Sequence, residues 1–135
     1  MWTAETVLVC ALTLLGRPAD SFPPITFMNE PPADVSRYAE AFVRTGERRI
    51  YVITSSWMFQ RAQNATFQCG EHQALRKLAS VLVHEEWHVT HGGDEAGAYA
   101  AQLITLAYLG SGPGHPTYYD VSLSMRMTLQ GRKGR

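Results

Sequence analysis

The sequence has no excess of positive or negative charge, because twelve lysine and arginine residues balance twelve aspartate and glutamate residues. Proteins that bind nucleic acid or an anionic membrane surface usually carry a clear basic excess, so the balance argues against both partners. The apolar run from Val7 to Leu15 is shorter than the about 20 residues that a membrane-spanning helix needs. We therefore expect neither nucleic-acid binding nor stable insertion in a membrane.

Cysteine is scarce: the chain contains Cys10 and Cys69 alone. These two residues do not have the Cys-x-x-Cys spacing of redox sites or of structural zinc sites. They can form one disulfide or remain as two thiols, and their spacing does not decide between the two states. Because unpaired cysteines are among the most frequently buried residues, the sequence favours two buried thiols.

The chain is also short. Its 135 residues suffice for one domain with a modest core and leave no room for a second catalytic domain. A hydrophobic fraction of 45% with 18% charged residues is typical of a globular protein rather than a disordered one. We therefore expect residues 1–135 to form a single domain, whose oligomeric state the sequence does not indicate.

Residues 1–16 allow two interpretations, an N-terminal helix of the folded domain or a secretion leader. The apolar run has the length of a leader core, but no lysine or arginine precedes it and no Ala-x-Ala cleavage pattern follows it. Thr3 is a suitable N-cap for a helix, and Gly16 is a suitable stop. These signals favour the folded helix, and with it a cytoplasmic protein over a secreted one.

The rest of the chain mixes strand and helix patterns. Runs rich in β-branched and aromatic residues predict strands over residues 25–28 and 48–56. Helical spacing of apolar residues predicts helices over residues 34–43, 57–65, 71–89, 94–109 and 121–130. The predicted fold class is therefore α+β, with additional helices at the N- and C-terminal ends.

The most informative pattern is a His-Glu-x-x-His motif, which runs from His84 to His88 within the predicted helix of residues 71–89. Two histidines four residues apart lie on one face of a helix, so both imidazoles can reach one metal ion. Glu85 points about 100° around the helix from His84 and can act as general base toward a metal-bound water. We expect the next residue, Glu86, to be solvated instead. The motif predicts a Zn²⁺-dependent hydrolase.

A catalytic zinc needs a third protein ligand, and His91, Asp94 and Glu95 are candidates. His91 lies close to a double glycine that ends the helix. Asp94 can instead cap the following helix or orient an imidazole from outside the metal's ligand shell. Glu95 has the longer side chain, and a tight glycine turn would fold its helix back beside the histidines. The sequence favours Glu95 and leaves the other two open.

Peptide hydrolysis also needs a donor that stabilises the developing oxyanion. Tyr99 lies four residues after Glu95, on the same face of the predicted second helix, and is a possible donor. A tyrosine at this position can equally be a core residue. Other candidates near the site are His91, His115, Tyr118 and Tyr119.

Together with Glu95 and the following Ala98-Tyr99, the motif from His84 to His88 resembles the active-site helix and the glutamate helix of the gluzincins. The chain's size is similar to that of the single-domain minigluzincins. The resemblance implies a small twisted β-sheet packed on an active-site helix, with the glutamate helix behind it. One strand of that sheet would lie at residues 50–54, and an extended substrate would pair with the sheet's edge strand.

The resemblance further implies a zinc metallopeptidase that cleaves a peptide or protein substrate, with His84, His88 and Glu95 as metal ligands and Glu85 as general base. An alternative is a zinc-binding regulatory or protein-interaction module with the same fold and little turnover. In that case residues 110–117 or the C-terminal segment would block the cleft. The connection from the second histidine to Glu95 is shorter than in many gluzincins, which keeps Asp94 open as a ligand.

Overall fold

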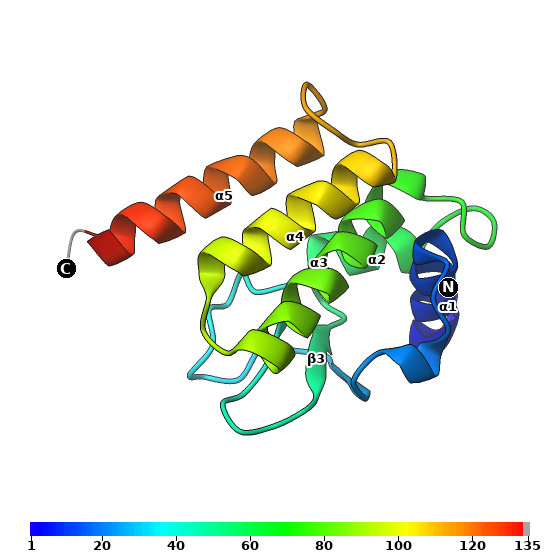
Figure 1. The fold of residues 1–135 in the computed structure, drawn as a ribbon. Coiled ribbons are helices and arrows are strands. Elements are labelled where there is room, and N and C mark those ends of the chain that lie inside the picture. Colours follow the sequence, from blue (N-terminus) through cyan, green and yellow to red (C-terminus); the bar gives the residue numbers. More distant parts are fainter. Residues whose placement is uncertain (134–135) are drawn as a thin grey trace.

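The computed structural model describes residues 1–133 and has an α+β fold, as the sequence predicts. The helices are α1 (Ala4–Leu15), a 3-10 turn η1 (Ala19–Ser21), α2 (Trp57–Gln63), α3 (His72–His91), α4 (Glu95–Tyr108) and α5 (Pro116–Lys133). The strands are β1 (Ile25–Met28), β2 (Ala41–Phe42) and β3 (Ile50–Ile53). Helix α4 lies between α3 and α5, and the C-terminal part of α5 extends beyond the other helices (Figure 1).

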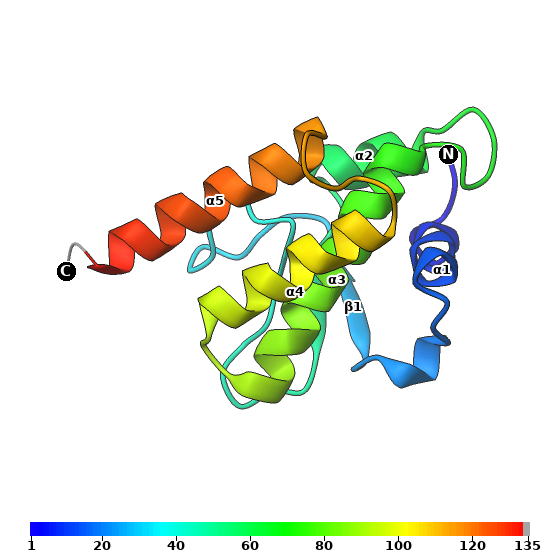
Figure 2. The same cartoon turned by 45° about the horizontal axis from the view of Figure 1, so that its top comes forward.

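Helix α3 is the centre of this arrangement. It lies between α4 and α1 in both views of the molecule, and α2 and the sheet also contact it (Figure 2). Its residues Leu78 and Leu82 are almost completely buried, in one core with Phe59 of α2. Truncating a buried aromatic such as Phe59 to alanine would cost about 3–5 kcal/mol of stability. The helix that carries the His-Glu-x-x-His motif is therefore also the scaffold of the core.

The sheet is small and mixed, with the strand order β1-β3-β2. Strand β1 runs parallel to β3, with Ile25 opposite Ile50, and β2 runs antiparallel to it, with Ala41 opposite Val52. Ile50 and Val52 are fully buried, as expected for a central strand. The strand predicted over residues 48–56 is thus confirmed at β3. Strands β1 and β2 are the two edge strands of the sheet.

The N-terminal helix forms as its capping signals predict. The hydroxyl of Thr3 accepts a hydrogen bond from the backbone N–H of Thr6, and Gly16 ends the helix with a φ of +66°. That left-handed conformation is one that glycine adopts without a steric penalty. The inner face of α1 includes the buried residues Val7 and Leu12.

The prediction of two buried thiols is wrong, because Cys10 and Cys69 form a disulfide. It joins α1 to the loop before α3, and the two Cα atoms are 5.5 Å apart. Cys69 has a φ of +59°, a conformation that non-glycine residues seldom adopt. This pairing brings together residues 59 positions apart, which local sequence patterns do not reveal.

The helix predicted over residues 34–43 is also wrong. Turns and bends stand in place of the helix over residues 34–40, and Ala41–Phe42 pairs with β3 as strand β2. The Ser36 hydroxyl accepts a hydrogen bond from the Tyr38 N–H and so stabilises a turn instead of a helix. Tyr38, within this segment, is 78% exposed.

The last helix is longer than predicted, since α5 spans Pro116–Lys133 instead of residues 121–130. Proline at its first position is compatible with a helix, because the first turn needs no backbone N–H there. Val121 packs with Leu103 and Leu106 in a second, smaller core between α4 and α5. No helix within residues 1–133 has the length and apolar character needed to cross a membrane.

Candidate metal centre

Helices α3 and α4 are joined by a turn at Gly92–Gly93, as predicted. Gly92 has a φ of +72°, and its N–H closes the helix on the carbonyl of His88 at 2.9 Å. Asp94 then caps α4, its carboxylate accepting a hydrogen bond from the N–H of Gly97 at 3.1 Å. The turn places Glu95, the first residue of α4, beside the last turns of α3.

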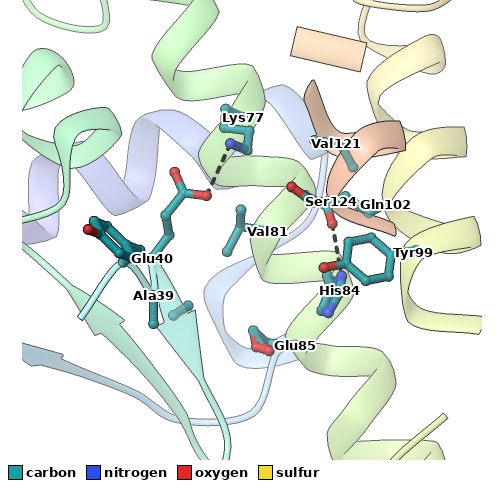
Figure 3. Close-up of a pocket in the computed structure, with 12 residues that line it drawn as sticks. Ala39, Glu40, Lys77, Val81, His84, Glu85, Tyr99, Gln102, Val121 and Ser124 are labelled. Atoms are coloured by element: carbon teal, nitrogen blue, oxygen red, sulfur yellow. Dashed lines mark hydrogen bonds and ion pairs between the residues drawn. The ribbon is translucent and has the colours of Figure 1, made fainter. Parts of the chain in front are cut away.

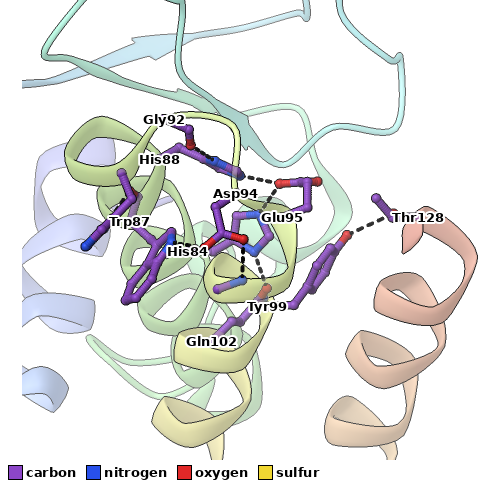
Figure 4. A network of polar contacts seen from close by, with 11 residues as sticks. His84, Trp87, His88, Gly92, Asp94, Glu95, Tyr99, Gln102 and Thr128 are labelled. Atoms are coloured by element: carbon purple, nitrogen blue, oxygen red, sulfur yellow. Dashed lines mark hydrogen bonds and ion pairs between the residues drawn. The ribbon is translucent and has the colours of Figure 1, made fainter. Parts of the chain in front are cut away.

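His84, His88 and Glu95 converge at this point (Figure 4). Oε1 of Glu95 contacts Nε2 of His88 and lies 3.5 Å from Nε2 of His84. One ligand atom each from His84, Glu85 and His88 lies within 4.8 Å of the other two. This is the one such group in the part of the chain that the structure describes, and Glu95 is not a member of it, although its Oε1 approaches both imidazoles.

A buried hydrogen-bond chain defines the tautomer of His84. The Ser80 hydroxyl donates to the carbonyl of Lys77 at 2.7 Å, so its oxygen accepts from the side-chain amide of Gln102 at 3.2 Å. Gln102 must then present its oxygen to Nδ1 of His84, 2.8 Å away. Nδ1 therefore carries a hydrogen, and Nε2 faces the centre of the site.

His88 is oriented in the same way. Its Nδ1 donates to the carbonyl of Gly92 at 2.7 Å, and a carbonyl oxygen can only accept.

The hydrogen bond with Glu95 raises the pKa of His88 to about 9. Hydrogen bonds from His84 and then from His88 hold the pKa of Glu95 well below its ordinary value. Both imidazoles thus direct Nε2 at an ionised carboxylate.

Glu85 has a different environment from Glu95. It is only 6% exposed, and burial raises its pKa to about 7. Its Oε2 is the one buried side-chain oxygen or nitrogen within residues 1–131 that has no hydrogen-bond partner. Burying an unpaired carboxylate oxygen is costly, so such an atom indicates a functional partner at the site.

Two hollows meet at Glu85. One, of about 230 Å³, extends along α3 toward Lys77 and is also lined by Tyr99 and by Val121 of α5 (Figure 3). The other, of about 530 Å³, lies between the end of α3 and the segment after β2, and His88 lines it. His84 lines the smaller hollow and His88 the larger one, and β2 contributes Ala41 to the first and Phe42 to the second.

The remaining ligand candidates lie away from this cluster. Asp94 accepts hydrogen bonds from the indole of Trp87 and from the N–H of Gly97, and is therefore a cap. His91 is exposed and stacks on Trp87, with ring centroids 3.9 Å apart. Glu95 is the only one of the three candidates that contacts both imidazoles.

Tyr99 is the only one of the oxyanion candidates that lines either of these two hollows. Its ring meets His84 edge-on with centroids 4.6 Å apart, and its hydroxyl lies 3.4 Å from Oγ1 of Thr128 in α5. Burial raises the pKa of this hydroxyl. His115 accepts a hydrogen bond from the backbone at the start of α5, and Tyr118 packs between α4 and α5. Tyr119, the last candidate, is 59% exposed.

The sequence patterns did not identify Gln102 and Ser80. Gln102 lies seven residues, or two helical turns, after Glu95, and that spacing could have placed it on the same face of α4. Glu86, expected to be solvated, instead forms a two-pronged ion pair with Arg17, with nitrogen–oxygen distances of 2.7 and 2.6 Å. It lies outside the metal-ligand cluster.

Comparisons of the chain with protein-family models, with curated proteins and with solved structures found no match. Its function is therefore inferred from the residues of the chain itself.

Proposed function

We propose that the protein is a zinc-dependent metallopeptidase with a zincin-like fold, similar to the minigluzincins. His84, His88 and Glu95 are the proposed ligands, and Glu85 is the proposed general base. The observation that carries the proposal is the unpartnered, buried Oε2 of Glu85 beside two imidazoles whose Nε2 atoms face the same point. Two imidazoles and one carboxylate from two helices are a donor set that suits zinc and leaves a fourth position open.

Zinc bound there would supply a Lewis acid that polarises the substrate carbonyl and acidifies a water molecule. Glu85 accepts a proton from the attacking water as the carbon–oxygen bond forms. It then passes this proton to the leaving nitrogen as the carbon–nitrogen bond breaks. Because burial raises the pKa of Glu85 to about 7, the carboxylate is a stronger base than an exposed glutamate.

Strand β2 offers an edge for an extended substrate. The carbonyl of Glu40 accepts from the N–H of Ile53 at 3.0 Å, and Phe42 is paired with Tyr51. In an antiparallel ladder the residue between two such pairs turns its N–H and C=O away from the neighbouring strand. Ala41 occupies that position and lines the smaller hollow. A peptide pairing with Ala41 would lie across the two imidazoles.

A zinc-binding regulatory module with little turnover is the second candidate. It is supported by the position of α5, which forms a wall of the smaller hollow through Val121 and Ser124 (Figure 3). The hydroxyl of Tyr99 is also engaged with Thr128 of the same helix. A fixed α5 would restrict entry of a substrate side chain.

The test combines metal analysis with peptide cleavage. We expect about one zinc per chain, which His84→Ala or His88→Ala removes. Glu85→Gln should retain zinc and abolish cleavage of a peptide library, whereas the neighbouring Glu86→Gln, as a control, should retain both. A zinc-loaded protein that cleaves no peptide would favour the regulatory module. A protein that binds no zinc would refute both functions.

A further inference from the structure

We infer that Trp87, Asp94 and Gly97 form a latch across the α3–α4 turn that positions Glu95 as a metal ligand. This inference rests on the proposed zinc site and assigns a role to three residues that are not themselves proposed zinc ligands. We call these three residues the helix latch.

A single carboxylate holds the two helices together in the latch (Figure 4). The indole Nε1–H of Trp87, on α3, donates to Oδ2 of Asp94 at 3.3 Å. Oδ1 of the same carboxylate accepts the N–H of Gly97, in the first turn of α4, at 3.1 Å. Asp94 therefore binds α3 and α4 at once, and each bond is strengthened by its negative charge.

Gly97 allows the indole to lie directly against the backbone of α4. A Cβ atom at this position would lie 2.6 Å from ring carbons of Trp87 and 2.3 Å from Oδ2 of Asp94. Both distances are below the contact limit of carbon and oxygen atoms. His91 covers the indole as well, with the two rings stacked at an interplanar angle of 18°. Trp87 is thus held between α4 and the last turn of its own helix.

The latch residues are sequence neighbours of two proposed ligands. Trp87 precedes His88, and Asp94 precedes Glu95. The link between Trp87 and Asp94 therefore sets the position of the Glu95 backbone relative to that of His88. The connecting turn contains two glycines, which restrict the backbone less than other residues do. With α4 beginning in this position, the carboxylate of Glu95 reaches both Nε2 atoms.

Loss of the latch should therefore weaken zinc binding by way of Glu95. Trp87→Phe keeps an aromatic ring but removes the donor to Asp94, and Gly97→Ala forces the indole away from α4. Removing residues that orient metal ligands lowers metal affinity by about 10- to 100-fold, and we expect at least the lower end of this range. Trp57→Phe, at a site 78% exposed on α2, is the matched control and should leave the affinity unchanged.

The deciding measurement is the zinc dissociation constant, obtained from competition with a chelator. It is measured for Trp87→Phe and for Gly97→Ala, each in a protein that retains Glu95 and in one that carries Glu95→Ala. A latch that acts through Glu95 should lower the affinity only while Glu95 is present. An equal loss in both backgrounds, or no loss in either, would overturn the latch. Thermal melting of each metal-free variant shows whether it folds, and Trp87→Phe provides the test if Gly97→Ala does not. If the unmutated protein binds no zinc, the proposed function fails instead.

Discussion

Oε1 of Gln102 lies 2.8 Å from Nδ1 of His84 and accepts its hydrogen across the interface between α3 and α4. Gln102 is 4% exposed, and its amide nitrogen is bonded to Ser80, which is fully buried. Rotation of the amide would break its hydrogen bonds with Ser80 and His84, and bulk water does not replace them at this buried position. An imidazole that would bind metal through Nε2 is oriented by a residue 18 positions further along the chain.

Replacement of Gln102 by leucine should lower zinc affinity by about 10- to 100-fold, because Nδ1 of His84 loses the acceptor that orients it. Chelator competition measures the change. Gln73→Leu, at an exposed position near the start of α3, is the control and should have no effect. Equal affinities in the two variants would show that Gln102 does not orient the ligand.

The stability of the chelator-treated protein should depend on pH through Glu85. Burial raises its pKa to about 7, above the ordinary 4.5, so the unfolded chain loses this proton at a lower pH than the folded one. Stability should therefore fall as the pH rises from 4.5 to 7 and stay lower above that range. The shift corresponds to about 3 kcal/mol at pH 8.

Glu85→Gln should remove the contribution of Glu85 and make the metal-free protein more stable at pH 8, although it abolishes catalysis. In this variant the raised pKa of His88 still lowers stability as the pH rises from 6.5 toward 9. Denaturant unfolding at pH 5 and pH 8 tests this expectation. Glu86→Gln, which breaks the ion pair with Arg17, should leave the dependence between pH 4.5 and 7 in place. A Glu85→Gln variant that is less stable at pH 8 would contradict the assignment of the buried, unpaired oxygen.

Zinc binding at pH 8 should release about one proton from His88. The hydrogen bond with Glu95 raises the pKa of His88 to about 9, so this imidazole carries an extra proton at pH 8 that a metal must displace. Glu95 is already ionised there and releases none. Zinc affinity should accordingly increase as the pH rises toward 9.

Calorimetric titrations in buffers of different ionisation enthalpy measure this proton release. His91→Ala should release the same amount, since His91 is exposed and stacks on Trp87 outside the ligand cluster. Zinc binding without proton release would contradict a His88 that is both protonated at pH 8 and a zinc ligand.

Reduction of the disulfide between Cys10 and Cys69 should destabilise the fold without weakening the metal centre. A cross-link that spans 59 positions restricts the unfolded chain and contributes about 4 kcal/mol in the chain-entropy model. The double variant Cys10→Ala/Cys69→Ala should unfold at a lower denaturant concentration than the oxidised protein. Its zinc affinity should be unchanged, because His84 and His88 lie at the other end of α3; a large loss would contradict this separation.

Local patterns in the sequence determined the helices that carry the site. The four-residue spacing of His84 and His88 places them on one face of any α-helix, and the Gly92–Gly93 turn followed by the Asp94 cap ends one helix and begins the next. Strand β3 was equally visible in its β-branched and aromatic residues. These features depend on neighbours within one or two helical turns, so the sequence alone suffices to predict them.

Tertiary structure alone decided which distant residues meet. The Cys10–Cys69 disulfide, the Gln102 bond to His84 and the pairing of Ala41 with Val52 join residues that are 59, 18 and 11 positions apart. For Ala41, pairing with β3 prevailed over a helical pattern, and the ladder supplies a partner for the backbone carbonyl of its neighbour Glu40. Such contacts depend on how helices and strands pack together, and no local period or propensity encodes that geometry.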